Sequence, residues 1–314
     1  MVQVKDYPEF SWSFTKHKML LECELRYALS YYYSYGGWRQ DASNRSRHIY
    51  RLKTLQSINM AFGSAVHSQI HRIVGQPDSW KKMPTELEIM TNVRADLNKA
   101  YQDSKYRHAS WYENPSNTQM LMEIYYDGEL PFEVIEDYQT RLPVTAQNLL
   151  SCPTIHHDLL QKRNDFKLIT SERFRCIEFK GVKVWVVLDL LYQDLKNKKY
   201  VIVDFKTGKQ SANGDEVTQL MLYAWFVRET FGIDSLEQIE LRNEYLADGR
   251  TLTFIPTPFD FEKIEYLLHT SIERMHSYLK DVERNVPTEL EQFQPTKNRR
   301  ACERCSFREL CNVV

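Results

Sequence analysis

The spacing of hydrophobic residues predicts that the first half of the chain is mainly helical. In residues 11–35 and 55–75, apolar side chains recur every three or four positions, which is the period of an amphipathic helix. Further helices are expected over 85–108 and 145–161. Prolines are expected to separate these elements, at Pro115, Pro131 and Pro143.

The pattern changes near residue 166, where apolar runs bounded by turn residues replace the helical spacing. Three consecutive strands are predicted over 166–177, 182–192 and 200–205, with turns at Lys180-Gly181 and Lys196-Asn197-Lys198. The later part predicts a helix over 216–231, a hairpin of strands over 237–246 and 251–255 around Asp248-Gly249, and a long helix over 260–284.

Strands followed by a helix and further strands favour an α/β fold with a mixed central sheet flanked by helices. Helical additions are expected before and after this core. We therefore predict a helical N-terminal part over 1–165, a core over 166–258 and a C-terminal part with a cysteine cluster over 259–314. The three parts are expected to pack as one integrated domain.

Composition and charge restrict the class of protein. The 314 residues are 42% hydrophobic and 26% charged, which is ordinary for a soluble globular protein. A formal net charge of -1 gives no overall attraction for nucleic acid, so any binding must come from local patches. The sequence has neither a signal-peptide pattern nor a run of about 18 apolar residues that could span a membrane. We therefore expect a soluble, cytoplasmic protein.

Two acids and a lysine form the clearest candidate site. Asp204-Phe205-Lys206-Thr207 ends a predicted strand, and alternation places Asp204 and Lys206 on one face and Phe205 on the other. Asp189 interrupts an otherwise apolar run in the preceding strand. Carboxylate oxygens suit Mg²⁺ or Mn²⁺, and a metal held there could act on a phosphodiester. The alternative is an ordinary ion pair at a strand end, but an acid inside an apolar run favours a functional site.

Weaker signals lie on the neighbouring predicted helices. His67 follows Gly63 and precedes His71 by four residues, so all three share a helix face, and the glycine allows another backbone to approach closely. Gln219 and Tyr223 have the same spacing on the helix after the Asp-Lys strand. Taken alone, the two histidines are better explained as half-buried polar residues, Tyr223 as a core residue and Gln219 as a solvated one. Further polar positions receive little weight: Glu172 and His156-His157.

The cysteines have the spacing of metal ligands. Cys302, Cys305 and Cys311 form a C-x₂-C-x₅-C pattern, and in a reducing compartment this spacing favours a metal over disulfides. Three thiolates leave one coordination position, for which Cys23 is the best candidate. The site could hold a [4Fe–4S] cluster or a structural Zn²⁺, and unligated cysteines are the remaining alternative. Two cysteines stand apart from this set: Cys152 and Cys176.

A basic segment follows the first predicted helix, and aromatic residues precede it. Basic and aromatic side chains together suit a groove that tracks phosphates while bases stack, so this segment is a candidate DNA-binding surface. The alternative is a solvated loop after a core helix. The basic side chains are Arg39, Arg45, Arg47, His48, Arg51 and Lys53, and the preceding aromatic ones are Tyr31, Tyr32, Tyr33, Tyr35 and Trp38.

Taken together, these residues resemble the RecB-like branch of the PD-(D/E)XK nuclease superfamily in its iron–sulfur form, which includes the AddB nuclease domain and the CRISPR-adaptation nucleases. The chain departs from the family pattern at Trp185, where a glycine is common four residues before the strand aspartate. The resemblance covers residues 11–311 and rests on an ordered set: Cys23 with Tyr27, Gly63-x₃-His67, Asp189, Asp204-Phe205-Lys206-Thr207-Gly208, Gln219-x₃-Tyr223 and Cys302-x₂-Cys305-x₅-Cys311.

The resemblance implies a mixed central sheet of the restriction-endonuclease-like type and a role for each matched residue. Mg²⁺ or Mn²⁺ is expected on four groups, namely His67, Asp189, Asp204 and the Phe205 carbonyl. The expected catalytic set is Asp189, Asp204, Lys206, Gln219 and Tyr223, of which the last two shape the site and contact DNA. The expected ligands of the [4Fe–4S] cluster are Cys23, Cys302, Cys305 and Cys311.

These observations predict a metal-dependent deoxyribonuclease that acts on single strands or DNA ends. No G-x₄-G-K-[ST] motif is present, so coupling to unwinding requires a helicase or another repair, defence or recombination partner. One alternative is a non-catalytic DNA-binding or scaffold subunit of a nuclease or helicase complex. Another is a zinc-stapled interaction protein. Residues 76–160 match no recognised motif.

Overall fold

The computed structural model describes residues 7–75, 83–210 and 214–311, and it contains a mixed five-stranded sheet. In the order β2-β5-β6-β7-β8, β6 and β7 run parallel and the other neighbours run antiparallel. The predicted mixed α/β fold is therefore confirmed. The strands are β2 (Phe166–Thr170), β5 (Leu190–Asp194), β6 (Lys199–Lys206), β7 (Ile239–Tyr245) and β8 (Arg250–Phe254).

A second, three-stranded sheet has the order β1-β4-β3, with β1 parallel to β4. It consists of β1 (Ser11–Ser13), β3 (Arg173–Phe179) and β4 (Val182–Leu188). Two of the predicted strands are thus wrong in extent, because 166–177 breaks at Ser171-Glu172 and 182–192 breaks at Asp189. Leu188 and Leu190 are both fully buried, so the apolar run continues across Asp189 in the sequence. The two leucines nevertheless pack in different hydrophobic cores.

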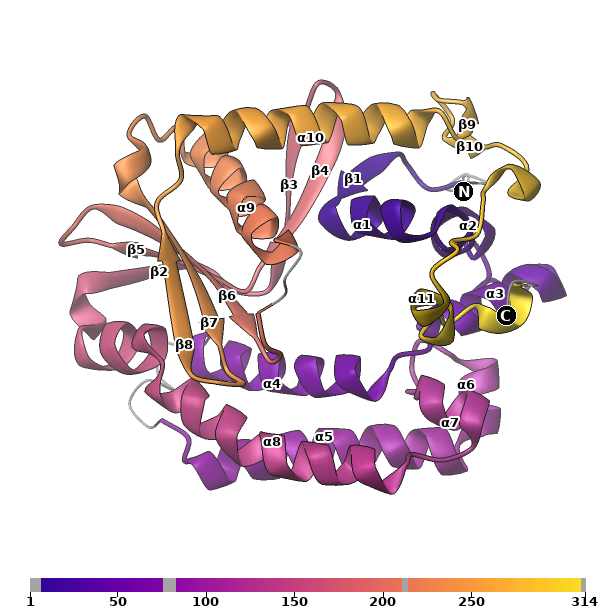
Figure 1. Cartoon of the computed structure of the whole chain (residues 1–314), viewed down its shortest axis with the longest axis horizontal. Coiled ribbons are helices and arrows are strands. Elements are labelled where there is room, and N and C mark those ends of the chain that lie inside the picture. The colour runs from indigo at the N-terminus through magenta and orange to yellow at the C-terminus, as the bar shows by residue number, and fades with distance from the viewer. Residues whose placement is uncertain (1–6, 76–82, 211–213, 312–314) are drawn as a thin grey trace.

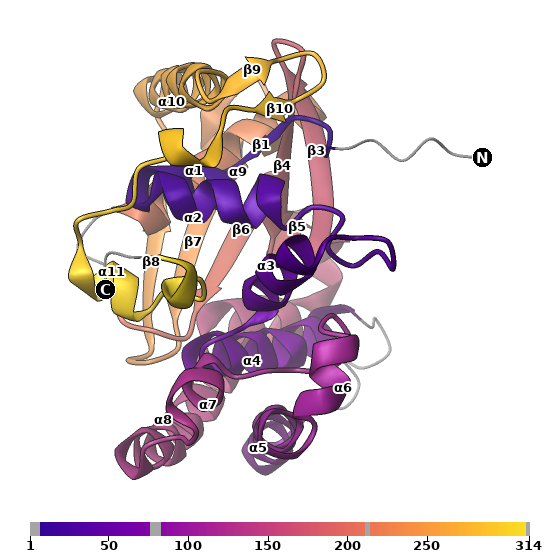
Figure 2. The ribbon, with the colours of Figure 1, turned by 90° about the vertical axis from the view of Figure 1, so that its right-hand side faces the viewer.

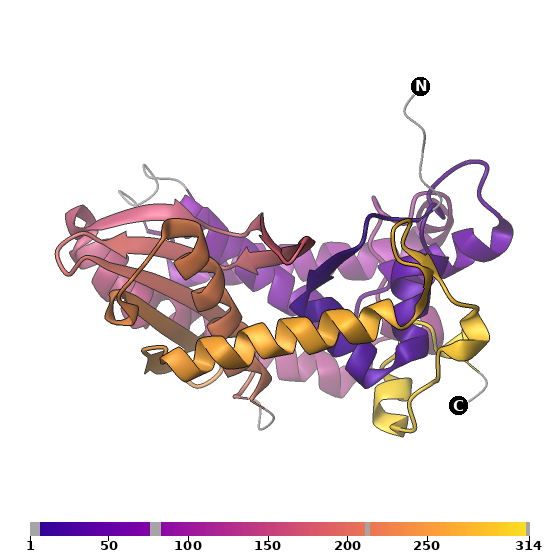
Figure 3. The ribbon, with the colours of Figure 1, turned by 90° about the horizontal axis from the view of Figure 1, so that it is seen from above.

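Helices cover both faces of the larger sheet (Figure 1). On one side lie α9 (Asp215–Phe231) and α10 (Pro258–His276), and on the other α4 (Ile58–Gly75), α5 (Glu86–Tyr106) and α8 (Phe132–Ser151). Alternation along β6 supplies both cores, since Ile202 packs with the residues of α9 while Val203 and Phe205 pack with those of α4. Seen from above, α10 extends from the larger sheet to the N-terminal helices (Figure 3).

The N-terminal segment 11–35 is not the single helix that its periodicity predicts. Its first residues form β1, and the Ser13 side chain then caps α1 (Phe14–Glu22) by accepting from the Lys16 N–H. At Cys23 the backbone becomes extended, with φ −161° and ψ 112°, which separates α1 from α2 (Glu24–Ala28). A π-helix, η1 (Leu29–Tyr33), follows, and the basic segment forms the helix α3 (Asn44–Thr54) instead of a loop.

Three other boundaries differ from the prediction. Pro143 lies inside α8, and the predicted helix over 145–161 comprises the end of α8 and a π-helix, η3 (Pro153–Gln161). The predicted helix over 260–284 ends at His276, and β9 (Leu279–Asp281) then pairs with β10 (Val286–Pro287). The remaining short elements are α6 (His108–Glu113), α7 (Met122–Asp127), η4 (Arg163–Asp165), η5 (Leu236–Gln238), η6 (Leu290–Gln292), α11 (Arg299–Glu303) and η7 (Arg308–Leu310).

Segments from the first and last parts of the described chain lie side by side. The C-terminal segment with α11 descends beside α2, as Figure 2 shows, and the Leu25 N–H donates to the Gln294 carbonyl at 3.2 Å. Within the described ranges, none of the helices has both the length and the apolar character required to cross a membrane.

Candidate active site

The junction between the two sheets holds the predicted acids. Asp189 lies between β4 and β5, and its Oδ2 accepts a hydrogen bond of 2.8 Å from the Phe205 N–H on β6. Asp204 and Lys206 lie on one face of β6, and Phe205 is buried on the other face. The predicted alternation is therefore confirmed. Lys206 Nζ lies 2.6 Å from Asp204 Oδ2. The sequence-distant Asp189 is therefore fixed against the strand that carries Asp204 and Lys206.

His67 reaches this junction from α4. Its Nε2 lies 3.1 Å from the Phe205 carbonyl, and its Nδ1 lies 3.5 Å from Asp189 Oδ1 and 3.3 Å from Glu172 Oε1. Burial lowers the pKa of the imidazole, but hydrogen bonds and attraction from Asp189 and Glu172 outweigh it and raise the pKa to about 10. The acids therefore favour the imidazolium form of His67, and its proton must leave before the ring nitrogen can bind a metal.

Glu172 is a site residue that the sequence analysis undervalued. It interrupts the run between β2 and β3 with a positive φ of 46°, and its N–H donates to the Leu188 carbonyl at 2.8 Å. The signal that could have revealed it is the adjacent pair Ser171-Glu172 in the middle of a predicted strand, which parallels Asp189 in the next one. His71, by contrast, contacts the Ser171 hydroxyl at 3.2 Å.

Burial makes the acidic pair electrostatically unfavourable without a cation. Asp204 is only 3% exposed, and burial together with the charge of Asp189 raises its pKa to about 7, against the opposing effect of Lys206. Its Oδ2 has an ion-pair contact with Lys206 but no well-directed hydrogen bond. Burial lowers the pKa of Lys206, but Asp204, Asp189 and Glu216 outweigh it and raise that pKa.

This donor set fits a hard divalent cation in its chemistry, because carboxylate and carbonyl oxygens come to the junction from separate elements. In the described part of the chain, however, no three or more His, Cys, Asp or Glu side chains already have an arrangement that could hold a metal ion. In the structure, His67 and Lys206 provide the positive charge beside the acids.

Helix α9 supplies the polar side of the site. Gln219 Oε1 accepts from Lys206 Nζ at 3.0 Å, and Gln219 Nε2 donates to the Tyr223 hydroxyl at 2.7 Å. Burial and the charges of Asp204 and Asp189 raise the pKa of Tyr223, so the phenol stays neutral. The Gln219 amide therefore links Lys206 to Tyr223, which explains why Gln219 and Tyr223 lie on the same face of α9. Glu216 completes this side by accepting from the Tyr245 hydroxyl at 2.6 Å, and no sequence pattern marks either residue.

Gly63 lies near the site but is not needed for a close approach. A Cβ added there would meet only Thr207 Oγ1, at the ordinary contact distance of 3.7 Å. The expectation that this glycine lets another backbone come close is therefore wrong.

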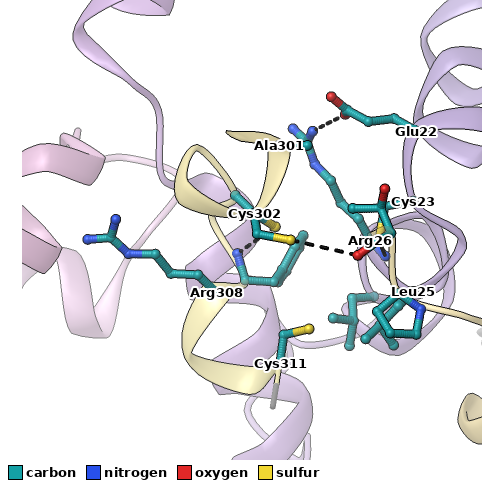
Figure 4. Close-up of a pocket in the computed structure, with 13 residues that line it drawn as sticks. Glu22, Cys23, Leu25, Arg26, Ala301, Cys302, Arg308 and Cys311 are labelled. Carbon is teal, nitrogen blue, oxygen red and sulfur yellow. Dashed lines mark hydrogen bonds and ion pairs between the residues drawn. The ribbon is translucent and has the colours of Figure 1, made fainter. Parts of the chain in front are cut away.

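The four clustered cysteines line one pocket between α1–α2 and the C-terminal segment. In Figure 4 the sulfur atoms of Cys302 and Cys311 point toward the helical segment that carries Cys23. Burial and the proximity of Cys311 and Cys23 raise the pKa of the Cys302 thiol. Cys152 is buried elsewhere, in the core with α4 and α8, and Cys176 is exposed on β3.

The basic segment is largely engaged with the protein itself. Arg45 is exposed, and Lys53 Nζ lies 5.5 Å from the centre of the Tyr31 ring. The other three guanidinium groups have protein partners: Arg39 pairs with Asp41, Arg47 donates to the Gln40 carbonyl, and Arg51 covers the Tyr112 ring and donates to its carbonyl.

Comparison with protein families gives the assignment. A sequence model described as the PD-(D/E)XK nuclease superfamily matches residues 11–312, a range that begins at β1 and includes the acids, the lysine and the clustered cysteines. The chain belongs to the PD-(D/E)XK nuclease superfamily. Members are nucleases, that is, phosphodiester hydrolases that generally use divalent metals such as Mg²⁺ or Mn²⁺. The predicted superfamily is thereby confirmed, while its iron–sulfur branch stays a prediction.

Other comparisons add little. No curated protein matches the chain. Among solved structures, one titled "Crystal structure of SSO0001" covers 57% of this chain and 80% of its own, at 16% identity and a TM-score of 0.26. A likeness of this size carries no argument about function.

Proposed function

We propose that this PD-(D/E)XK protein is a metal-dependent deoxyribonuclease acting on single strands or DNA ends. The observation that carries the proposal is the junction at which Asp189, Asp204 and Lys206 meet, with His67 3.5 Å from Asp189 Oδ1. Buried like charges are costly in a structural role, whereas a cation and a phosphate would use both acids and the lysine.

The proposed metal ligands are His67, Asp189, Asp204 and the Phe205 carbonyl, with Glu172 as a further acid beside them. Bound Mg²⁺ or Mn²⁺ supplies Lewis-acid polarisation of the phosphate and a more acidic water. The protein fixes Asp189 through the Phe205 N–H and keeps the carbonyl of the same residue directed at His67.

Lys206 has the proposed role of stabilising charge on the phosphate. Gln219 accepts a hydrogen bond from the Lys206 ammonium and donates one to the Tyr223 hydroxyl. The ammonium is therefore oriented before substrate arrives. The neutral Tyr223 phenol and the Gln219 amide are also proposed to contact DNA, because both line a cleft that contains Asp189.

The four cysteines are proposed to hold a [4Fe–4S] cluster, with Zn²⁺ as the alternative. Their support is their common pocket, to which Cys23 comes from one end of the chain and the others from the opposite end. We further propose that Arg45, which is exposed, and Lys53 contribute to DNA binding and that unwinding depends on a separate helicase partner.

The test uses protein purified without oxygen and end-labelled single- and double-stranded DNA with Mn²⁺. Wild type should cleave, and Asp204→Asn should be inactive while binding the same DNA. Lys206→Ala should bind Mn²⁺ by calorimetry yet cleave at least about a hundredfold more slowly. Asp248→Asn, at the exposed turn between β7 and β8, is the matched control and should cleave normally. Cleavage by Asp204→Asn at the wild-type rate contradicts the assignment.

A further inference from the structure

A cleft of about 740 Å³ opens beside Asp189 and is not explained by the metal site alone. One wall comes from β1, α1 and η1, another from β3 and β4, and the third from α9. Asp189, Gln219 and Tyr223 lie at its inner side, so whatever fills the cleft also reaches the acids.

Two large aromatic side chains project into this cleft. Phe174 on β3 is 75% exposed and Trp185 on β4 is 37% exposed, and their ring centres are 6.4 Å apart. Phe174 and Trp185 occupy diagonal positions on one face of the small sheet. Val184 and Val186 lie on its other face and are buried. Exposing such rings in water is unfavourable, so an aromatic pair at the mouth of a polar site indicates a binding surface for another aromatic group.

Cations lie at the opposite wall. Lys16 Nζ is 5.2 Å from the centre of the Tyr31 ring and donates to the Ser11 carbonyl and hydroxyl, each at 2.8 Å. Lys53 Nζ lies 5.5 Å from the same ring. In the part of the chain that the structure describes, neither ammonium forms a salt bridge with a carboxylate. Burial and the nearby Lys53 lower the pKa of Lys16 to about 8, which is the behaviour of a cation that lacks an anion.

A second cleft on the other side of α1 provides a contrast. It has a volume of about 730 Å³ and includes Lys206 and Gln219, but its cations are already paired. Lys18 lies 2.7 Å from Asp215, and Arg26 lies 2.6 Å from Glu22. Unpaired cations and exposed aromatic rings thus occur together only in the first of these two clefts.

We propose that the cleft with Phe174 and Trp185 binds single-stranded DNA, whose bases stack on these two rings and whose phosphates pass Lys16 and Lys53 on the way to Asp189. The proposal rests on the nuclease function above and specifies its substrate. Unpaired bases offer their faces for stacking, whereas a duplex hides them, so this surface selects single strands.

The experiment measures binding separately from cleavage. Affinity for a fluorescently labelled oligothymidylate and for a duplex of equal length is determined in EDTA, where no cleavage occurs. Phe174→Ala combined with Trp185→Ala should weaken single-strand binding about ten- to a hundredfold and leave duplex binding nearly unchanged. The single variant Trp185→Phe, which keeps an aromatic face, should bind single strands nearly as tightly as wild type. Tyr266→Ala, which removes an exposed aromatic ring from α10, is the matched control.

The outcomes separate this proposal from the proposed function. If the double variant binds the oligothymidylate as tightly as wild type, or loses single strands and duplex equally, the stacking cleft is wrong even when Mn²⁺-dependent cleavage persists. If the double variant instead changes the oligomeric state without changing DNA affinity, the aromatic pair is a protein interface and the proposal also fails. If single-strand binding is lost but wild type never cleaves, the cleft stands and the nuclease assignment fails.

Discussion

The Phe205 N–H donates to the Asp189 carboxylate at 2.8 Å, and this bond ties the break between the two sheets to the strand that carries Asp204 and Lys206. One carboxylate thus has two tasks. Its Oδ2 holds the backbone of β6, and its Oδ1 faces His67 at 3.5 Å.

Substitutions at Asp189 should separate these tasks. Asp189→Asn keeps a carbonyl oxygen for the Phe205 N–H, so the free energy of unfolding should stay near that of wild type while cleavage falls at least about a hundredfold. Asp189→Ala also leaves the N–H without its partner and should lose about 1–3 kcal/mol of stability. Denaturant unfolding and cleavage rates check both. An active Asp189→Asn enzyme would show that the carboxylate has only a structural task.

Two glycines should respond oppositely to alanine. Gly63→Ala places its Cβ at ordinary distance from Thr207 and removes a flexible residue from the interior of α4, so it should raise stability by up to about 1 kcal/mol. At Gly37 an added Cβ would collide with the Ser46 carbonyl and Tyr50 Cβ, so Gly37→Ala should destabilise the protein. Thermal unfolding measures both. Loss of stability in Gly63→Ala would restore the close-approach role expected from the sequence.

Single-strand affinity should depend on pH through Lys16. In the free protein the pKa of this ammonium is lowered to about 8 by burial and Lys53. A phosphate beside it raises that pKa, so the complex holds more protons than the free protein, and affinity should fall as pH rises from about 7 to about 9. Tyr31, whose pKa is raised to about 12 by burial, stays neutral throughout this range.

The matched variant for this pH effect is Lys16→Arg, because a guanidinium stays charged throughout the range. Its affinity should vary less with pH than that of wild type, and Lys53, whose pKa is also lowered by burial, would account for any remaining slope. Identical pH profiles for the two proteins would remove Lys16 from the binding surface.

The cysteine set should show itself by colour and stability. Protein purified without oxygen should be brown, and Cys23→Ala and Cys311→Ala should each lose the colour and much of the thermal stability, because the cluster joins the two ends of the folded chain. Cys152→Ala and Cys176→Ala are the controls and should stay brown. A colourless preparation with one tightly bound zinc would replace the iron–sulfur assignment by the zinc alternative.

Much of the core was predictable, because each element there has a local signal. The turns at Lys180-Gly181 and Asp248-Gly249, the helix over 216–231 and the alternation at Asp204-Phe205-Lys206 follow from side-chain periodicity and turn chemistry. The break at Asp189 was not predictable, because Leu188 and Leu190 on its two sides are both fully buried and the apolar run continues across it.

The composition of the site was less predictable than the core. The polar pair Ser171-Glu172 marks a break in the strand, but the place of Glu172 beside His67 depends on where the small sheet turns toward the larger one. Likewise, the cleft wall at Tyr31 depends on a π-helix, and no residue pattern in Leu29–Tyr33 distinguishes that helix from an ordinary α-helix.

The pairing of β1 with β4 also determines the order in which the molecule can be completed during synthesis. Ser11–Ser13 leaves the ribosome early, yet its parallel partner Val182–Leu188 is made about 170 residues later, and Trp12 Nε1 donates to Ser271 Oγ, which is separated from it by 259 positions. Until those residues emerge, α1 has no sheet to rest on and the wall that carries Lys16 cannot form. A nascent chain therefore has no closed cleft until the residues around Ser271 have been made.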